Sequence, residues 1–335
     1  MIWRTEMERI KIVVDTKGGD NGAGVLVEGV AEALSKHPEI SFILTGDSEP
    51  LKDECSARGV PTDRIEIIEA PEEITNYDSP ATAVFTKPNS SMLVGLRALA
   101  EDPAAMGMIT SGNTGVALVG AMRELTDEAK TRPALAAVLP AQTGEFTCIV
   151  DTGATIDCNP PLLVHFAHIG SDFMRRMYGI ESPRVGLLSN GSEPTKGNRL
   201  VKESHKLLAE DAGINFIGNV EGNSALSGSC DVLVCDGFDG NQVLKVTEGT
   251  ASRIITDIMK YAHKKNSAEI KELGMHLMGL YDIGSLGGGI ILGLKKPVIK
   301  IRGNAGGKAV VSTSGMLLNM AQNKSVYDGE ASTIS

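Results

Sequence analysis

The chain has 335 residues, enough for one large α/β domain or two lobes. Its net charge is −10, which argues against a nucleic-acid partner, because phosphate backbones require clustered Lys and Arg. No apolar run reaches the ~18 residues of a transmembrane helix. The 42% hydrophobic content and 38 glycines suit an enzyme of the α/β class with many short turns.

The five cysteines are odd in number and form no C-x-x-C pair. We therefore expect reduced thiols and a cytoplasmic protein. Cys158 and Cys235 could act as nucleophiles, but each follows an apolar run, and a buried thiol is inert. The sequence favours non-covalent catalysis.

The first expected strand covers residues 10–14 and opens into glycines after Asp15. A helix is predicted over 23–35, and further strands over 40–44 and 65–68. Glycines at such a strand end allow a backbone to approach a ligand closely. Asp15 is therefore a candidate substrate-binding residue.

The polar segment 78–91 leads into a helix predicted over 92–100. Ser90 and Ser91 stand where that helix begins. They either cap the helix, or present their hydroxyls and the helix-end N–H groups to an anion, with Lys87 close by.

A strand over 106–109 ends in Ser111-Gly112-Asn113, and a helix over 116–125 follows. A loop of this kind can direct several N–H groups at a phosphate or a developing oxyanion. The chain has neither a Walker loop nor a G-x-G-x-x-G fingerprint, so we discount nucleotide hydrolysis and NAD binding.

Arg132 precedes an apolar strand, and a strand over 146–150 ends at Asp151. The helix expected over 161–178 carries His165 and His168 on one face. No further ligand of matching spacing joins them on that helix, so ordinary surface histidines are favoured over a metal pair.

The strand over 184–188 is followed by a polar loop in which Lys196 and Asn198 stand where a helix should begin. The N-terminus of a helix favours anions, so Lys196 is either an anion ligand or a solvated loop lysine.

A buried strand over 232–234 runs directly into CDGFDGNQVLK. Asp236, Asn241 and Lys245 would supply an acceptor, an amide and a cation in one short loop, with a helix beginning near residue 243. The alternative is a tight turn in which Asp236 only caps that helix. Two helices are then expected over 251–263 and 267–280, followed by a strand over 298–301 and a helix over 310–320.

The recurring unit is a strand, a polar glycine-rich loop and a helix. Such loops converge at the carboxyl edge of a mostly parallel sheet, so we expect one shared hollow among Ser111, Lys196 and Asp236. The expected cations of this site are Lys87, Arg132, Lys196 and Lys245.

The motifs VDTKGGD, DSPATAV, SGNTG, RPALA, DTGATIDC, PRVGLLSNGSEPTKGN, FIGNVEG and DVLVCDGFDGNQVLK occur in this order and resemble the phosphate acyltransferase family from about residue 12 to residue 320. The resemblance implies a three-layer α/β/α sandwich with a mostly parallel, Rossmann-like sheet, related to phosphotransacetylases. It also implies a homodimeric transferase of fatty acid metabolism and phospholipid biosynthesis.

On this resemblance residues 9–323 form a single domain, possibly of two lobes, with the helical pair 251–280 projecting. Residues 1–8 would be a disordered extension, and residues 324–335 a flexible tail. The pair is polar at its tip, so at most weak peripheral membrane contact is expected.

The implied reaction joins inorganic phosphate to the acyl group of an acyl-acyl-carrier-protein thioester, without a metal or a cofactor. We expect Lys196 and Asn198 to bind phosphate, with Arg132 or Lys245 assisting. Ser111 and Asn113 are the expected oxyanion donors, and Asp236 would orient a cation or accept a proton.

Two alternatives remain open. One is a short-chain phosphate acetyl- or butyryltransferase that uses CoA thioesters, or an acetyl-transferring subunit of a reductase complex. Phe85, Thr155 and Ser189 depart from the family pattern, which leaves a non-catalytic subunit that binds an acyl carrier as the other alternative.

Overall fold

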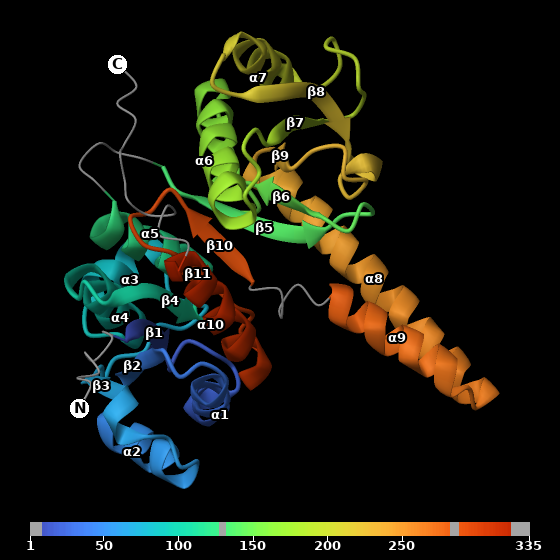
Figure 1. The fold of residues 1–335 in the computed structure, drawn as a ribbon. Coiled ribbons are helices and arrows are strands. Elements are labelled where there is room, and N and C mark those ends of the chain that lie inside the picture. The colour runs from blue at the N-terminus through green and yellow to red at the C-terminus, as the bar shows by residue number, and fades with distance from the viewer. Residues whose placement is uncertain (1–8, 127–131, 282–287, 323–335) are drawn as a thin grey trace, which may run out of the picture. The chain divides into compact units, whose positions relative to one another are not determined.

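The computed structural model describes residues 9–126, 132–281 and 288–322 (Figure 1). The chain divides into two compact units: unit 1 comprises residues 1–133 and 287–335, and unit 2 comprises residues 134–286. The predicted extension 1–8 and tail 324–335 lie outside the described residues.

Unit 1 contains strands in the order β3-β2-β1-β4-β11-β10. All neighbours pair in parallel except β10 and β11, which are antiparallel. Its elements are β1 (Ile10–Asp15), α1 (Gly22–Lys36), β2 (Ile40–Gly46), α2 (Ser48–Ala57), a 3₁₀ turn (Thr62–Arg64), β3 (Ile65–Glu69), α3 (Pro80–Thr86), α4 (Ser91–Glu101), β4 (Ala105–Thr110), α5 (Thr114–Leu125), β10 (Gly289–Leu292), β11 (Val298–Lys300) and α10 (Gly307–Gln322).

Helices cover the sheet of unit 1. Helix α4 packs on β1, β2 and β4, while α1 packs against α10. A side chain at Gly29 would come within 2.4 Å of the Gly307 carbonyl oxygen, so glycine allows α1 and α10 to approach this closely. Helices α2 and α3 and the antiparallel strand β10 were not expected from the sequence.

Unit 2 contains strands in the order β5-β6-β9-β7-β8, of which β5 and β6 are antiparallel and the rest parallel. Its elements are β5 (Ala134–Pro140), β6 (Phe146–Val150), α6 (Pro160–Tyr178), β7 (Arg184–Ser189), α7 (Arg199–Glu210), β8 (Asn215–Glu221), a 3₁₀ turn (Gly222–Ser224), β9 (Val232–Val234), α8 (Gly237–Lys265) and α9 (Ala268–Tyr281). These elements confirm the predicted α/β class with a mostly parallel sheet.

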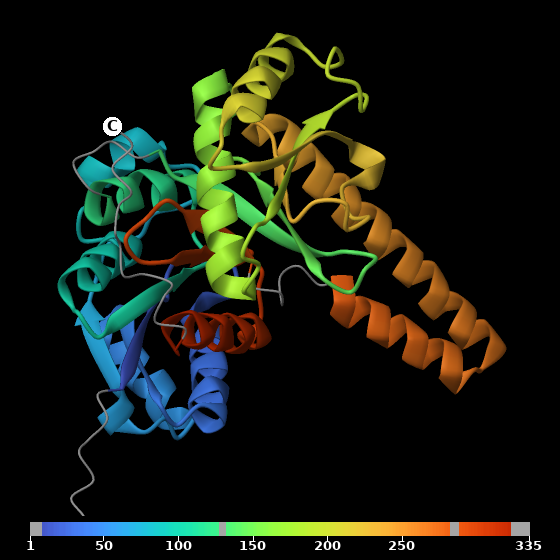
Figure 2. The same ribbon diagram turned by 45° about the horizontal axis from the view of Figure 1, so that its top comes forward.

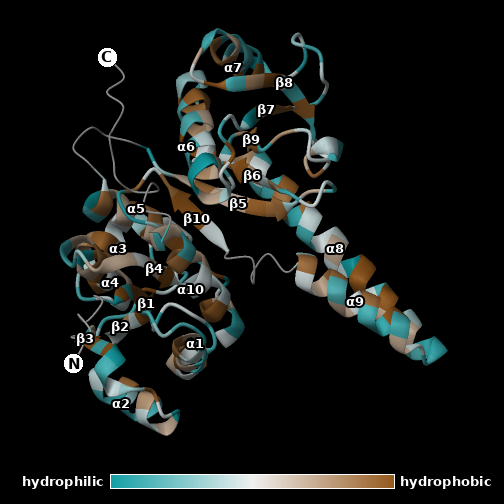
Figure 3. Ribbon diagram, viewed as in Figure 1, coloured by the Kyte–Doolittle hydropathy of each residue, from teal (hydrophilic) through white to brown (hydrophobic). Residues whose placement is uncertain are grey.

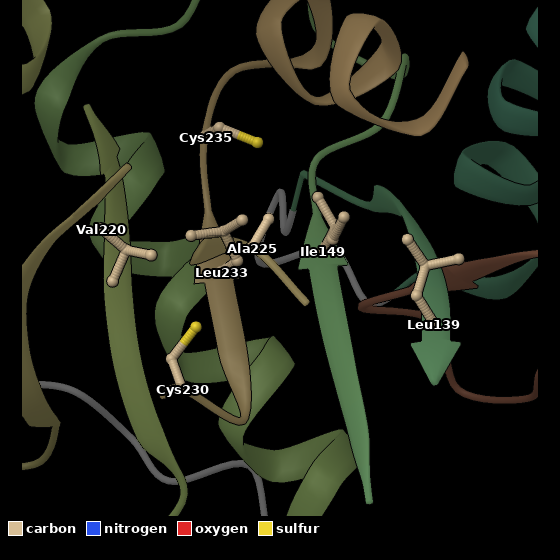
Figure 4. Packing of buried hydrophobic residues seen from close by; sticks show 7 residues of the cluster. All are labelled: Leu139, Ile149, Val220, Ala225, Cys230, Leu233 and Cys235. Atoms are coloured by element: carbon tan, nitrogen blue, oxygen red, sulfur yellow. The ribbon is translucent and has the colours of Figure 1, made fainter. Parts of the chain in front are cut away.

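The core of unit 2 follows from the alternation of side chains along its strands. Val232 faces α6, where a side chain at Gly170 would come within 2.8 Å of it. Leu233 faces the other way, into a buried cluster with Ile149 (Figure 4). Val243 of α8 packs against that cluster, so the sheet has a helix on each face.

Helix α8 is continuous over Gly237–Lys265, so the expected break before residue 251 is wrong. Asn266 ends it in the left-handed conformation, and α9 returns alongside α8 in both views (Figures 1 and 2). Both helices are mixed in hydropathy (Figure 3). None of the helices in the described ranges combines the length and the apolar character that a membrane span requires.

Candidate active site

The loop between β7 and α7 is built by two asparagines and a glycine. The Asn190 side-chain oxygen accepts a hydrogen bond from the Gly197 N–H at 2.8 Å, and Asn198 caps α7 by accepting from the Val201 N–H at 2.9 Å. Gly197 has φ +96°, and a side chain there would come within 2.4 Å of Val201. The loop therefore requires glycine at position 197.

Lys196 lies in the same loop, separated from the capping residue Asn198 by Gly197. Its N–H donates to the Glu193 carbonyl at 3.0 Å, and its side chain is exposed. Within the described residues no ion pair engages its ammonium. No ion pair within the described residues therefore neutralises the charge of this predicted anion ligand.

The loop between β9 and α8 packs closely on a second strand end. Asp236 caps α8, accepting from the Asp239 N–H at 2.8 Å. A side chain at Gly237 would meet the Asp151 carboxylate at 2.8 Å, and one at Gly240 would come within 1.9 Å of the Asp151 carbonyl oxygen. Both glycines are needed because the first turn of α8 lies directly on residue 151.

Asp151 organises the loop after β6. One carboxylate oxygen accepts from the N–H groups of Leu135, Gly153 and Ala154 at 2.9–3.1 Å, and the other from Thr155 at 2.6 Å. Burial raises the pKa of Asp151, and these four N–H donors oppose that rise. Sequence reasoning noted the loop but did not assign Asp151; the signal was an Asp at a strand end followed by Thr-Gly.

A hollow of about 550 Å³ lies between the β7–α7 loop and the start of α8. We call it the α7–α8 hollow. Its polar side chains are those of Ser189, Asn190, Asn198, Asp239 and Gln242. The Ser189 hydroxyl is buried and has no hydrogen-bond partner among the described residues. Sequence reasoning did not predict this hollow, although it singled out Asn198.

Asn241 and Lys245 lie on α8 itself, so the expectation that they share one loop with Asp236 is wrong. Asn241 donates to the Thr152 carbonyl at 3.1 Å. Lys245 is exposed and pairs with Glu248 at 3.1 Å.

Asp15 in unit 1 is buried, and its carboxylate is engaged on both oxygens. Ser91 donates to one oxygen, which also accepts from the Lys17 N–H at 3.2 Å, and Thr110 donates to the other at 2.7 Å. Burial raises the pKa of Asp15, and these hydrogen bonds oppose the rise. Through these hydrogen bonds Asp15 connects the end of β1 to Ser91 at the start of α4 and to Thr110 at the end of β4.

Ser90 and Ser111 are also buried, and neither hydroxyl has a partner among the described residues. Ser90 stands at the start of α4 without a side-chain capping bond. A side chain at Gly19 would come within 2.6 Å of the Ser111 oxygen.

Asn113 and Lys87 both bond to the segment 75–78 of unit 1. Asn113 caps α5 through the Val116 N–H at 3.2 Å and donates to the Thr75 carbonyl at 3.3 Å. Lys87 pairs with Asp78 at 2.8 Å. Arg132, the remaining predicted cation, is exposed. Substrate contacts for these residues stay predictions.

The predicted residues divide between the two units. Unit 2 brings together the loops that carry Lys196, Asn198 and Asp236. Ser111 belongs to unit 1, so the expected common hollow that includes it stays a prediction.

Two thiols and one of the histidines of unit 2 have hydrogen-bond partners. Cys235 is buried, its thiol donates to the Asp151 carbonyl at 3.4 Å, and burial raises its pKa well above the usual range, which disfavours the nucleophilic thiolate. The Cys158 thiol donates to the Thr155 carbonyl at 3.4 Å. His168 hydrogen-bonds Asp211 at 2.8 Å.

Comparison with solved structures supports the fold. The chain is similar to a phosphotransacetylase from Streptococcus pyogenes, with a TM-score of 0.63, 15% identity and 95% coverage of each chain. It is also similar to a branched-chain phosphotransacylase from Enterococcus faecalis, with a TM-score of 0.59 and 13% identity, over 93% of this chain and 98% of that one.

Comparison of sequences shows the family. The family described as Fatty acid synthesis protein matches residues 10–325. The phosphate acyltransferase of Halothermothrix orenii is 40% identical over 309 residues, covering 90% of this chain and 92% of that protein. The phosphate acyltransferase of Streptococcus agalactiae serotype Ia is 39% identical over 326 residues, covering 94% and 96%. The chain therefore belongs to the fatty acid synthesis protein family that includes these phosphate acyltransferases.

Proposed function

We propose that this chain transfers an acyl group from a thioester to inorganic phosphate and so supplies acyl phosphate for phospholipid synthesis. A phosphate oxygen attacks the thioester carbonyl carbon, the C–S bond breaks, and the thiol leaves with one proton. Phosphate is itself the nucleophile, so the protein contributes binding, orientation and stabilisation of charge.

The observation that carries this proposal is the position of Lys196. Lys196 lies in the loop that leads to Asn198, the capping residue of α7, and no ion pair among the described residues engages its ammonium. Asn198 caps that end with its side-chain oxygen, and a helix N-terminus attracts anions. We assign phosphate binding to Lys196, with the positive end of the α7 dipole assisting.

Two further roles complete the assignment. We assign oxyanion donation to the Ser111 hydroxyl, whose hydrogen has no acceptor among the described residues. Asn113 is a weaker candidate, because its amide already donates to the Thr75 carbonyl. Asp236 keeps one carboxylate oxygen beyond its capping bond, and that oxygen can orient the Lys196 ammonium or accept a proton.

The test is a panel of thioester donors. The chain is incubated with phosphate and acyl-carrier-protein or CoA thioesters of several lengths, and acyl phosphate is trapped with hydroxylamine. Acyl hydroxamate from the carrier-protein donors supports the proposal, and hydroxamate from acetyl- or butyryl-CoA alone supports a short-chain enzyme. Hydroxamate from no donor, with retained binding of an acyl carrier, supports a non-catalytic subunit.

We further propose a cytoplasmic homodimer that uses the exposed apolar side chains of α8 and α9. Ile254, Leu273 and Met275 are each more than half exposed, which is unusual for three apolar side chains on one helical pair. Light scattering after size exclusion tests the dimer, and flotation with anionic vesicles tests for weak membrane contact.

A further inference from the structure

The α7–α8 hollow combines neutral polar groups with apolar walls. Leu188, Val201 and Val243 supply apolar lining, and the side chains of Ser189 and Gln242 supply hydrogen-bonding groups. Its volume of about 550 Å³ is within the range of about 300–1,000 Å³ typical of small-molecule sites.

Several of its polar groups have hydrogen-bonding capacity that the protein leaves unused. The Ser189 hydroxyl is buried without a partner. Asn190 and Asn198 each use the side-chain oxygen in the loop, which leaves their NH₂ groups as donors. An unpaired buried hydroxyl costs free energy, so a ligand that supplies a partner is favoured.

The same lining disfavours an anion. Asp239 contributes a carboxyl group to the lining. Burial raises the pKa of this carboxyl group most, and the negative charge of the neighbouring Asp236 raises it further. None of the described residues that line the hollow is Lys or Arg. Phosphate would meet a carboxyl group here without a compensating cation, so this hollow suits a neutral ligand rather than phosphate.

We propose that the α7–α8 hollow binds the pantetheine arm of the thioester donor. This arm is a neutral chain with two amide groups, so it matches amide donors and acceptors set between apolar walls. Acyl carrier proteins and CoA present their thioesters on the same arm. The inference rests on the proposed function, because that reaction requires a thioester donor, and it adds the place where the arm is recognised.

The arm then approaches from the side of Lys196, since Gly197 and Asn198 line the hollow and Lys196 precedes them. Binding the arm beside the phosphate ligand brings the two reactants together, which is the main contribution available to a reaction without a covalent nucleophile.

The experiment compares two small donors that differ only in the arm. Acyl pantetheine carries both amides, and acyl N-acetylcysteamine carries one and lacks the rest of the arm; the acyl group is the one most active in the donor panel. Wild type is compared with Gln242→Ala and Ser189→Ala. Gln142→Ala is the matched control, because Gln142 is an exposed glutamine of unit 2 outside the hollow.

We expect wild type and Gln142→Ala to prefer acyl pantetheine, with each hollow variant losing about three- to tenfold of that preference, as expected for one neutral hydrogen bond. The phosphate KM stays unchanged. A preference that is absent in wild type, or is retained in both hollow variants, overturns the inference. Neither replaced side chain has a hydrogen-bond partner among the residues that the structure describes, and equal thermal unfolding midpoints verify that the variants fold.

A binding measurement separates this inference from the proposed function. Free pantetheine is titrated into wild type and the same variants by calorimetry. Binding weakened only in the hollow variants supports the site even if no donor yields acyl phosphate. Equal affinity in all four proteins, or no binding to any, overturns it. Parallel kinetics with acyl-CoA and acyl-acyl-carrier-protein then show which carrier delivers the arm.

Discussion

The Asp151 carbonyl oxygen lies where a side chain at Gly240 would have to go, only 1.9 Å from the position of its Cβ. Gly240→Ala must therefore displace the first turn of α8 from the Asp151 loop. We expect a loss of about 1–3 kcal/mol in the free energy of unfolding, measured with urea.

The same helix offers a control. Gly249 has open space around it, so Gly249→Ala should stabilise α8 by roughly 0.5–1 kcal/mol. Equal effects of the two substitutions would contradict the close packing of residues 151 and 240.

Asp151 should be essential for the loop after β6. Asp151→Asn replaces an acceptor of four N–H groups by an amide whose NH₂ would face some of them. We expect a loss of about 1–3 kcal/mol in the free energy of unfolding. Asp157→Asn changes an exposed residue of the same loop and should stay within about 0.5 kcal/mol of wild type; an equally mild Asp151→Asn would refute this role.

Lys196→Met should raise the phosphate KM by about tenfold or more, or abolish turnover, because a hydrogen bond from a charged donor is lost. The KM for the thioester should change little. Lys206→Met removes another exposed lysine, on α7, and serves as the control. Unchanged phosphate kinetics in Lys196→Met would remove Lys196 from the site.

Asp78 offers a test by pH. The Lys87 ammonium, assisted by the Thr75 N–H and hydroxyl, lowers the pKa of Asp78 from 3.8 to about 2. Because the folded value lies below the unfolded one, this stabilising contribution is present above pH 3.8 and disappears as the pH falls toward 2.

Lys87→Met should therefore raise the Asp78 pKa toward 3.8, as followed by NMR titration of its carboxyl carbon. Lys36→Met breaks a different surface pair, with Glu32, and should leave the Asp78 value unchanged. An Asp78 pKa that is the same in wild type and Lys87→Met would show that the pair does not persist in solution.

Most of the strands were predictable because their buried apolar runs are local signals, although β10 was not expected. Strand β9 was expected over its observed residues 232–234. The start of α8 was not, because two glycines and polar residues favour a turn over a helix. Packing of Gly237 and Gly240 on Asp151 overrides that preference, and this contact joins residues that are far apart in the sequence.

The site was predictable only in part, because contacts between residues far apart in the sequence leave no local signal. Loop composition pointed to Lys196 and Asn198, whose placement at the start of α7 is a local property. The α7–α8 hollow depends on Ser189 at the end of β7 and Gln242 on α8 lining the same space, and no local pattern encodes that arrangement.

The most direct test of the central claim measures acyl phosphate formation and thiol release in the same reaction. The chain is given phosphate and an active thioester, acyl phosphate is observed by ³¹P NMR, and released thiol is measured in parallel. The account predicts one acyl phosphate formed and one phosphate consumed for each thiol released. Thiol release at the same rate without phosphate, and without an acyl phosphate signal, would show thioester hydrolysis instead and contradict the account.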